Sequence, residues 1–269
     1  MKSDNPNRIR NVLWTSGWDS TYMILEMLRN GETVQPVYII NPRRKSRFIE
    51  MEAMEKLEKK IRERVKTGKL LPTKKYDLRK VKIDKDIRKA LKQISKALTD
   101  DGRRPLGYQY EYLASFAKIH HDEYPVISLG VEKVSKNETG GLATAIRLFG
   151  KMTPDFRIDR AASQDVLITL LGNFDFPIID TTETEMLENV HKWQYEDIMK
   201  GIWFCHKPVR GEACGFCSPC FQKSIGDMGF LLSEEAQARF QKFKGIEKKY
   251  GRRAKQIADF FYRLTLPKK

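Results

Sequence analysis

One stretch near the start of the chain restricts its fold more than any other. An apolar run at residues 12–14 stops abruptly at small polar residues, and an amphipathic helical pattern follows at residues 19–29. Asn30 and Gly31 end that pattern, and a second apolar run occupies residues 34–40. A strand, a helix and a strand within so short a length form a βαβ unit, whose two strands are parallel. The sequence therefore predicts an α/β fold, with a Rossmann-like parallel sheet flanked by helices.

The loop between the first strand and the first helix has the composition of a phosphate-binding turn. It reads Thr15, Ser16, Gly17, Trp18, Asp19, Ser20 and Thr21. Backbone N–H groups, hydroxyls and the positive end of a helix dipole favour phosphate at such a turn. A carboxylate at Asp19 is placed to hold Mg²⁺ against phosphate oxygens. No stretch of the chain fits the Walker A pattern, because no lysine follows the loop. A plain strand-to-helix turn is the alternative interpretation.

All four cysteines lie in one short window, as Cys205, Cys214, Cys217 and Cys220. Such clustering favours metal binding in a reducing compartment over a disulfide framework. Four thiolates with no open position describe a structural, tetrahedral Zn²⁺ site. An iron–sulfur cluster uses the same ligands and is the alternative.

The net charge of +15 is concentrated in two segments. Residues 43–96 carry 21 Lys and Arg against 8 Asp and Glu, and residues 221–269 carry 12 against 5. A basic face fits a nucleic acid, an acidic protein partner or a solvated surface, and all three stay open. No apolar run reaches the roughly 20 residues of a membrane span, and residues 1–10 lack the apolar region of a secretion signal. We therefore expect a cytoplasmic protein with no membrane partner.

The loop and the cysteines together resemble a known family. Residues 15–20 match S-G-G-x-D-S, the signature of PP-loop ATP pyrophosphatases, with Thr15 for the first serine and Ser16 for the first glycine. Residues 202–205 and 214–220, followed by Gly229 and Phe230, resemble the T-W-S-C…C-G-x-C-x-x-C segment and the later G-F of the 7-cyano-7-deazaguanine synthase (QueC) family. Residues 105–109 and 127–131 are similar to that family's V-P-G-R-N and to its strand ending in G-V. The resemblance spans about residues 9–230, with specific motifs only at the two ends.

The resemblance implies an adenine nucleotide alpha hydrolase (HUP-type) fold and an AMP-forming ligase. In that family, ATP adenylates the carboxylate of 7-carboxy-7-deazaguanine, pyrophosphate leaves, and ammonia displaces AMP to give an amide. A second activation dehydrates the amide to the nitrile on the route to queuosine. By this resemblance residues 15–21 bind ATP, with Asp19 and Ser20 catalytic, Mg²⁺ and Zn²⁺ are cofactors, and the acceptor contacts Tyr108, Gln109 and Glu132.

The acceptor side departs from the family pattern. Tyr108 and Gln109 replace its Arg-Asn pair, the loop at residues 132–141 lacks its S-G-Y-P-D-C-R motif, and Glu183 stands in place of a lysine. A related acid is therefore an equal candidate for the acceptor, and a homodimer is left open. Family relatives occur in bacterial antiviral defence loci, and this divergent, basic chain is compatible with such a paralogue.

Other patterns predict further elements and the domain organisation. Helices are expected at residues 47–65, 84–98, 142–149, 162–171 and 254–264, and strands at 76–83, 124–129 and 176–179. Thr182 and Glu185 fit a capping box. We expect an ATP pyrophosphatase domain at residues 1–200 with a basic helical insert at about 43–98, a zinc segment at 201–230 and basic helices at 231–269.

Two other functions stay open. The first is a tRNA-modifying PP-loop enzyme of the lysidine or thiolation type, which the basic segments favour. Thiolation needs a free thiol, whereas zinc would occupy all four cysteines. The second is a non-enzymatic, zinc-stabilised nucleic-acid-binding module with a degenerate loop, for which Ser16 is the best support.

Overall fold

A six-stranded parallel sheet organises the chain. The computed structural model describes residues 9–133 and 141–250. The strands are β1 (Ile9–Leu13), β2 (Thr33–Ile40), β3 (Lys69–Leu70), β4 (Lys74–Asp77), β5 (Ile127–Ser128) and β6 (Phe174–Asp175). Their order is β3-β2-β1-β5-β6, and β4 also pairs with β2. The predicted βαβ unit is confirmed, because β1 and β2 pair in parallel from Ile9 beside Thr33 to Leu13 beside Val37.

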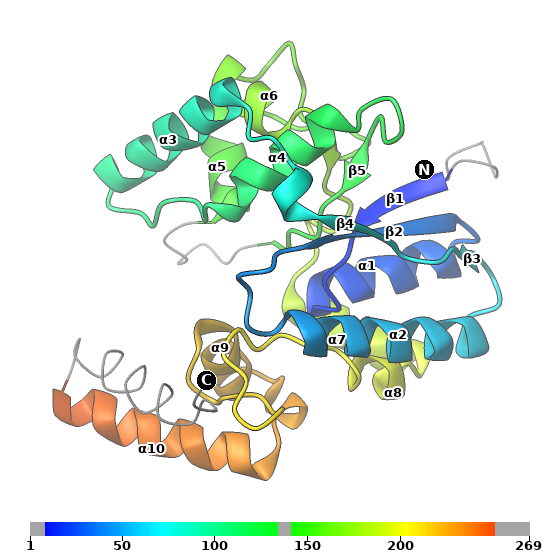
Figure 1. Ribbon diagram of the computed structural model, residues 1–269, viewed down its shortest axis with the longest axis vertical. Coiled ribbons are helices and arrows are strands. Elements are labelled where there is room, and N and C mark those ends of the chain that lie inside the picture. The colour runs from blue at the N-terminus through cyan, green and yellow to red at the C-terminus, as the bar shows by residue number, and fades with distance from the viewer. Residues whose placement is uncertain (1–8, 134–140, 251–269) are drawn as a thin grey trace.

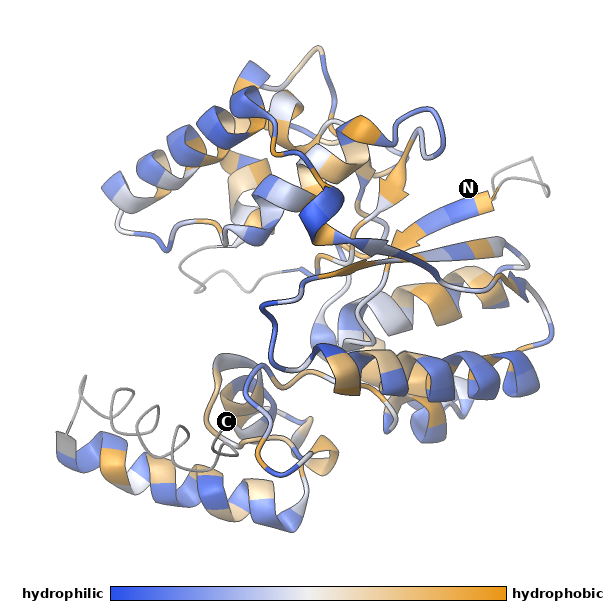
Figure 2. Cartoon of the chain, viewed as in Figure 1, coloured by the Kyte–Doolittle hydropathy of each residue, from blue (hydrophilic) through white to orange (hydrophobic). Residues whose placement is uncertain are grey.

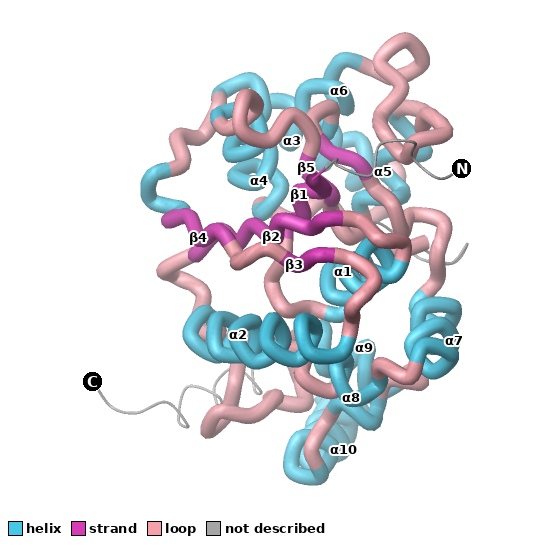
Figure 3. Tube along the Cα trace, turned by 90° about the vertical axis from the view of Figure 1, so that its right-hand side faces the viewer, coloured by secondary structure: helices cyan, strands magenta, loops and turns pink. Residues whose placement is uncertain are grey.

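Helices cover both faces of this sheet (Figures 1 and 3). On one face lie α1 (Trp18–Arg29), α2 (Arg47–Arg64), α7 (Glu183–Trp193) and α8 (Glu196–Met199). On the other lie α3 (Lys85–Asp100), α4 (Gln109–Ile119), α5 (Leu142–Phe149) and α6 (Asp165–Leu171). Short 3₁₀ turns η1 (Leu78–Lys80) and η2 (Gly229–Leu231), with α9 (Ser218–Ile225) and α10 (Glu234–Tyr250), complete the described elements.

The core has two halves because each strand buries both of its faces. Val12 packs with the α1 side of the sheet and Leu13 with the α4 side, as the alternation of side chains along a strand requires. Apolar residues on both faces are typical of a parallel sheet enclosed by helices. Figure 2 shows hydrophilic positions along α2 and α3, and both hydrophobic and hydrophilic positions in the strands. No helix among the described residues is long and apolar enough to cross a membrane.

Two regions differ from the sequence prediction. Residues 43–98, which their charge sets apart as a basic insert, contribute β3 and β4 to the main sheet beside β2. The predicted strand at 76–83 is therefore wrong in position, because β4 ends at Asp77 and η1 follows. The predicted strand at 176–179 is also misplaced, since β6 is Phe174–Asp175. The predicted helix at 254–264 lies outside the described residues.

Helix boundaries agree better with the sequence. The capping box that opens α7 is present, with Glu185 N–H donating to the Thr182 hydroxyl and the Glu185 carboxylate accepting from Thr182 N–H. In α2 the apolar residues Met54, Leu57 and Ile61, which recur at helical spacing, are buried. These elements carry strong local signals, namely a cap and a repeated apolar spacing.

Candidate active site

A cavity of about 500 Å³ opens at the carboxyl ends of β1, β2 and β5. Its wall includes Thr15 after β1, Arg44 after β2 and Gly130 after β5. In the sheet order, β1 lies between β2 and β5, so the chain leaves β1 toward one side of the sheet and later returns on the other. Such a switch point is where open α/β sheets bind ligands. The structure thus places the predicted loop at a site with room for a nucleotide.

The predicted loop residues divide into two groups. Thr15, Gly17, Trp18, Asp19 and Ser20 line the cavity. Ser16 and Thr21 are fully buried and lie outside the lining. These two residues are therefore structural here. The Thr21 hydroxyl accepts from Trp14 Nε1 at 2.9 Å, and the Ser16 carbonyl accepts from Trp203 N–H at 2.8 Å.

The backbone conformation at Ser16 explains why the motif has a glycine at this position. Its φ of 56° lies in the left-handed region, which costs a residue with a side chain about 1–2 kcal/mol relative to glycine. Its hydroxyl donates to the Thr15 carbonyl at 2.6 Å, and its side chain stays away from the cavity. The departure from the motif therefore does not obstruct the site.

Two glycines shape this side of the cavity, one by leaving space and one by allowing close packing. A Cβ atom built on Gly17 would lie 3.5 Å from Thr15 Oγ1 and 4.0 Å from Ser20 Oγ, which is ordinary contact. The protein itself therefore leaves open the space beside Gly17. At Gly130 a Cβ atom would lie 3.1 Å from Ser20 N and 3.2 Å from Asp19 Cβ. Gly130 is needed for the close approach of the β5 loop to the start of α1.

A lysine that the sequence analysis did not single out completes the site. Lys223, on α9, is 7% exposed, lines the cavity and forms an ion pair with Glu183. Its Nζ lies 5.4 Å from the centre of the Trp18 ring. Burial lowers the pKa of Lys223, and the carboxylates of Asp19 and Glu132 oppose this shift. Burial likewise raises the pKa of Asp19, against the positive charge of Lys223.

The three predicted acceptor residues lie at different depths. Gln109 and Glu132 line the cavity. Tyr108 is 62% exposed and lines a neighbouring cavity instead. His206, which the sequence prediction leaves out because four sulfurs already satisfy the metal, lines both cavities. Only its position directly after Cys205 could have indicated this.

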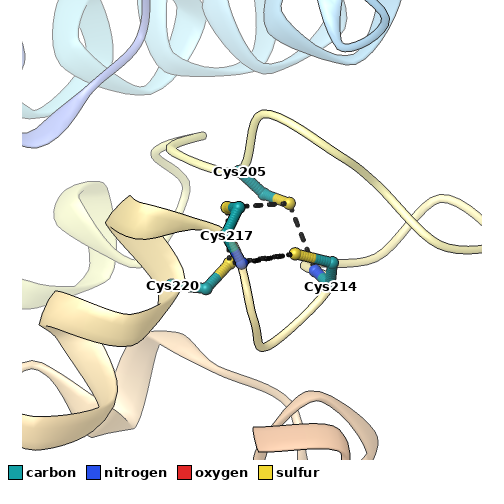
Figure 4. A group of neighbouring side chains, drawn as sticks. All are labelled: Cys205, Cys214, Cys217 and Cys220. Atoms are coloured by element: carbon teal, nitrogen blue, oxygen red, sulfur yellow. Dashed lines mark hydrogen bonds between the residues drawn. The ribbon is translucent and has the colours of Figure 1, made fainter. Parts of the chain in front are cut away.

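The four cysteines form one compact cluster (Figure 4). All are buried, and their sulfur atoms lie within 4.8 Å of one another. The Cys217–Cys220, Cys214–Cys220 and Cys205–Cys217 sulfur pairs are 3.4, 3.8 and 3.9 Å apart. A tetrahedral zinc with Zn–S bonds of about 2.3 Å separates its sulfurs by roughly 3.8 Å. The cluster is therefore compatible with zinc.

Backbone groups prepare these sulfurs for a cation. The N–H groups of Lys207 and Cys214 point to Cys205 Sγ at 3.4 and 3.2 Å. Those of Phe216 and Cys217 point to Cys214 Sγ at 3.4 and 3.2 Å. Such donors stabilise thiolates.

Helix α10 supports the cluster from outside. Arg239 donates to the carbonyls of Ala213 at 2.8 Å and Cys214 at 3.1 Å. Gly215 has a φ of 83°, and a Cβ atom there would lie 2.2 Å from the Ala236 carbonyl oxygen. Only glycine satisfies both conditions. Pro219 lies in the first turn of α9, where a proline needs no helical N–H partner.

No protein-family model matches the chain, and no curated protein matches it in sequence. Among solved structures, it is similar to the predicted subunit of a tRNA methyltransferase from Methanocaldococcus jannaschii. The two share 12% sequence identity, the match covers 71% of this chain and 84% of that one, and the TM-score is 0.36. A likeness of this degree carries no conclusion about function. What stands is a Rossmann-like parallel sheet with a four-cysteine cluster compatible with zinc.

Proposed function

We propose that this protein is an ATP-dependent, AMP-forming ligase of the 7-cyano-7-deazaguanine synthase type, which adenylates the carboxylate of 7-carboxy-7-deazaguanine or a related acid. One observation carries the proposal. The PP-loop-like turn, Asp19 and the buried Lys223 meet in one cavity of about 500 Å³ at the switch point of the sheet. By the PP-loop resemblance, the loop binds pyrophosphate as the leaving group, and Lys223 supplies from a distant segment the cation that the loop lacks.

In this proposal the chain's own residues bind and orient ATP. The Thr15 and Ser20 hydroxyls and the N-terminal amides of α1 surround the open space at Gly17, which suits the β- and γ-phosphates. Lys223 exchanges its partner Glu183 for a phosphate oxygen. Mg²⁺ held by Asp19 would offset further phosphate charge. The closely packed Gly130 keeps the β5 loop against α1, so the acceptor approaches from the side of Gln109 and Glu132.

The reaction then proceeds by displacement at the α-phosphorus. A carboxylate oxygen of the acceptor attacks that phosphorus, and pyrophosphate leaves. Ammonia attacks the resulting acyl carbon, AMP leaves with the bonding electron pair, and one proton is released to form the amide. A second ATP activates the amide oxygen in the same way. Loss of AMP and of protons from nitrogen then gives the nitrile.

The decisive experiment follows AMP release with ATP, Mg²⁺, ammonia and 7-carboxy-7-deazaguanine, with mass spectrometry of the products. Two variants test the site. Gly17→Ala is compatible with the backbone, because its Cβ atom meets only ordinary contacts, but it fills the space kept for phosphate. Asp19→Ala removes the Mg²⁺ ligand. Both should abolish AMP release with the fold and the zinc content unchanged, and unchanged AMP release in both would overturn the proposal.

The alternative functions have less support. All four cysteines gather in one cluster, which leaves no separate thiol for a tRNA thiolation. The non-enzymatic alternative rested on Ser16, whose side chain lies outside the cavity. A lysidine-type activation of tRNA retains one favourable observation, the basic cavity beside the candidate ATP site. Release of AMP that requires tRNA would favour it over the ligase.

A further inference from the structure

A second cavity, of about 580 Å³, adjoins the candidate ATP cavity. The two share Arg44, Gln109, Tyr112 and His206 in their walls, so a molecule in one lies directly beside a molecule in the other. Arg43, Arg44, Lys45 and Lys207 bring cationic side chains to the second cavity. None of the residues that line it is acidic, within the part of the chain that the structure describes. This lining favours an anionic ligand.

One of these cations is held in place by a buried network. Glu50 is 1% exposed and pairs with Arg44 Nε at 2.8 Å. The same carboxylate accepts hydrogen bonds from the Tyr38 hydroxyl at 2.8 Å and the Ser46 hydroxyl at 2.6 Å. Glu50 thus fixes both the start of α2 and the direction of the Arg44 guanidinium. A guanidinium held in one orientation loses little entropy when it binds an oxyanion.

An aromatic ring at the same cavity adds a second type of contact. Tyr108 lines the cavity while 62% of its surface is exposed. Its ring meets Tyr112 edge to face, with 5.9 Å between ring centres and an interplanar angle of 69°. Because most of its surface is exposed, the Tyr108 ring has room for a further partner. An exposed aromatic face beside several cations is the combination that binds a nucleobase and its phosphate.

We propose that the second cavity binds a nucleotide acceptor, either free or at the end of an RNA strand, that bears a phosphate in addition to the carboxylate which ATP activates. That this nucleotide is the acceptor rests on the proposed ATP-dependent function. That the cavity binds a nucleotide phosphate rests on the cavity alone. A monocarboxylate needs one cation, whereas this cavity presents Arg43, Lys45 and Lys207 besides the Glu50-paired Arg44. Such a set of cations suits a phosphate dianion. Tyr108 stacks on the base, and Arg44 directs the phosphate beside the shared wall.

The test measures equilibrium binding of three probes: GMP, guanosine and a 5′-phosphorylated RNA tetranucleotide. Saturating α,β-methylene-ATP with Mg²⁺ occupies the first cavity, so any binding reports on the second. The pocket variant combines Arg43→Gln, Lys45→Gln and Lys207→Gln. A double variant, Arg43→Gln with Lys45→Gln, leaves the cysteine segment intact. The matched control carries the same change of charge on exposed lysines outside the cavity, as Lys82→Gln, Lys89→Gln and Lys92→Gln.

We expect GMP or the RNA to bind the wild type at least tenfold more tightly than either pocket variant, and the control to stay within twofold of the wild type. Guanosine should bind at least tenfold more weakly than GMP. Binding of both phosphate probes indicates a free nucleotide acceptor, and binding of the RNA alone indicates a strand end. Equal binding by pocket and control variants, or guanosine as tight as GMP, would overturn the proposal.

The Gly17→Ala variant separates this proposal from the proposed function. It should retain charge-dependent GMP or RNA binding while AMP release is lost. If the wild type releases no AMP with any carboxylate, yet binds GMP through these cations, the ligase proposal fails and the nucleotide cavity stands.

Discussion

Replacing Lys223 with methionine removes the ammonium that faces Asp19 and pairs with Glu183. Methionine keeps much of the lysine's length, so the variant chiefly tests charge. A hydrogen bond between a lysine and a phosphate contributes about 1.5–3 kcal/mol to binding. At about 1.4 kcal/mol per tenfold change, Lys223→Met should weaken the binding of α,β-methylene-ATP by roughly 10- to 150-fold.

The same replacement should also change stability, by an amount that the exposure of Glu183 limits. Breaking a fully buried ion pair costs about 3–5 kcal/mol, because the remaining charge is left uncompensated. The Glu183 side chain is 33% exposed, so water solvates part of its charge. We therefore expect the free energy of unfolding to fall by only about 1–3 kcal/mol.

Calorimetric titration with the ATP analogue, urea unfolding and zinc analysis together test this reasoning. Lys223→Arg keeps the charge and should recover most of the affinity. Lys242→Met, on the exposed side of α10, is the matched control and should leave binding unchanged. If Lys223→Met bound the analogue within twofold of the wild type, its role as the phosphate cation would be refuted, whatever the stability showed.

Four further predictions concern the same site and its supports. Burial raises the pKa of Asp19 above 3.8, so the stability that its protonated form contributes is lost as pH rises through the folded-state pKa. Asp19→Asn should consequently be more stable than the wild type at neutral pH in urea titrations, with the difference vanishing toward pH 3.8; a variant less stable at neutral pH would contradict this. Metal removal by a chelator should weaken ATP-analogue binding in calorimetry, because Lys223 lies one helical turn after Cys220 on α9, and unchanged affinity would separate the cluster from the site. Gly215→Ala should lower the zinc content measured by mass spectrometry and reduce the free energy of unfolding by about 3–5 kcal/mol. This figure is the sum of left-handed backbone strain and of the lost Arg239 hydrogen bonds. A metal-loaded, fully stable variant would contradict the contact with α10. Glu50→Gln should reduce the free energy of unfolding by about 2–4 kcal/mol in urea, since a buried amide cannot accept as the carboxylate does, and should weaken GMP binding through Arg44; neither effect is expected of Glu52→Gln on the exposed face of α2.

The elements with strong local signals were predictable. The β1–α1–β2 unit follows from apolar runs separated by a turn and a helical pattern, and its parallel pairing follows from the crossover. The cysteine cluster follows from spacing alone, because residues so close in sequence need only a few turns to meet. These features depend on neighbours along the chain.

The misplaced strands depend on partners far along the chain. The β4 sequence begins with Lys74 and Lys75. Lysines on an edge strand discourage pairing with other chains. They also interrupt the alternation of apolar residues by which a strand is predicted from sequence. In β6 the buried Asp175 interrupts the apolar run, which shifted the prediction to residues 176–179. That aspartate is paired with Arg10 of β1 at 2.9 Å, a contact across the sheet that no local pattern contains.

Lys223 shows the same limit within the site, and it also joins the two motifs. The loop at residues 15–20 and the cysteine segment are distant in sequence, yet Trp203 N–H donates to the Ser16 carbonyl and Lys223 faces Asp19. The cysteine cluster has no open coordination position for chemistry when four sulfurs hold one zinc. Its contribution to the site is therefore geometric. It fixes the start of α9, and α9 carries the cation to a loop that lacks one. This arrangement accounts for two motifs at opposite ends of one chain, because each supplies half of a single cavity.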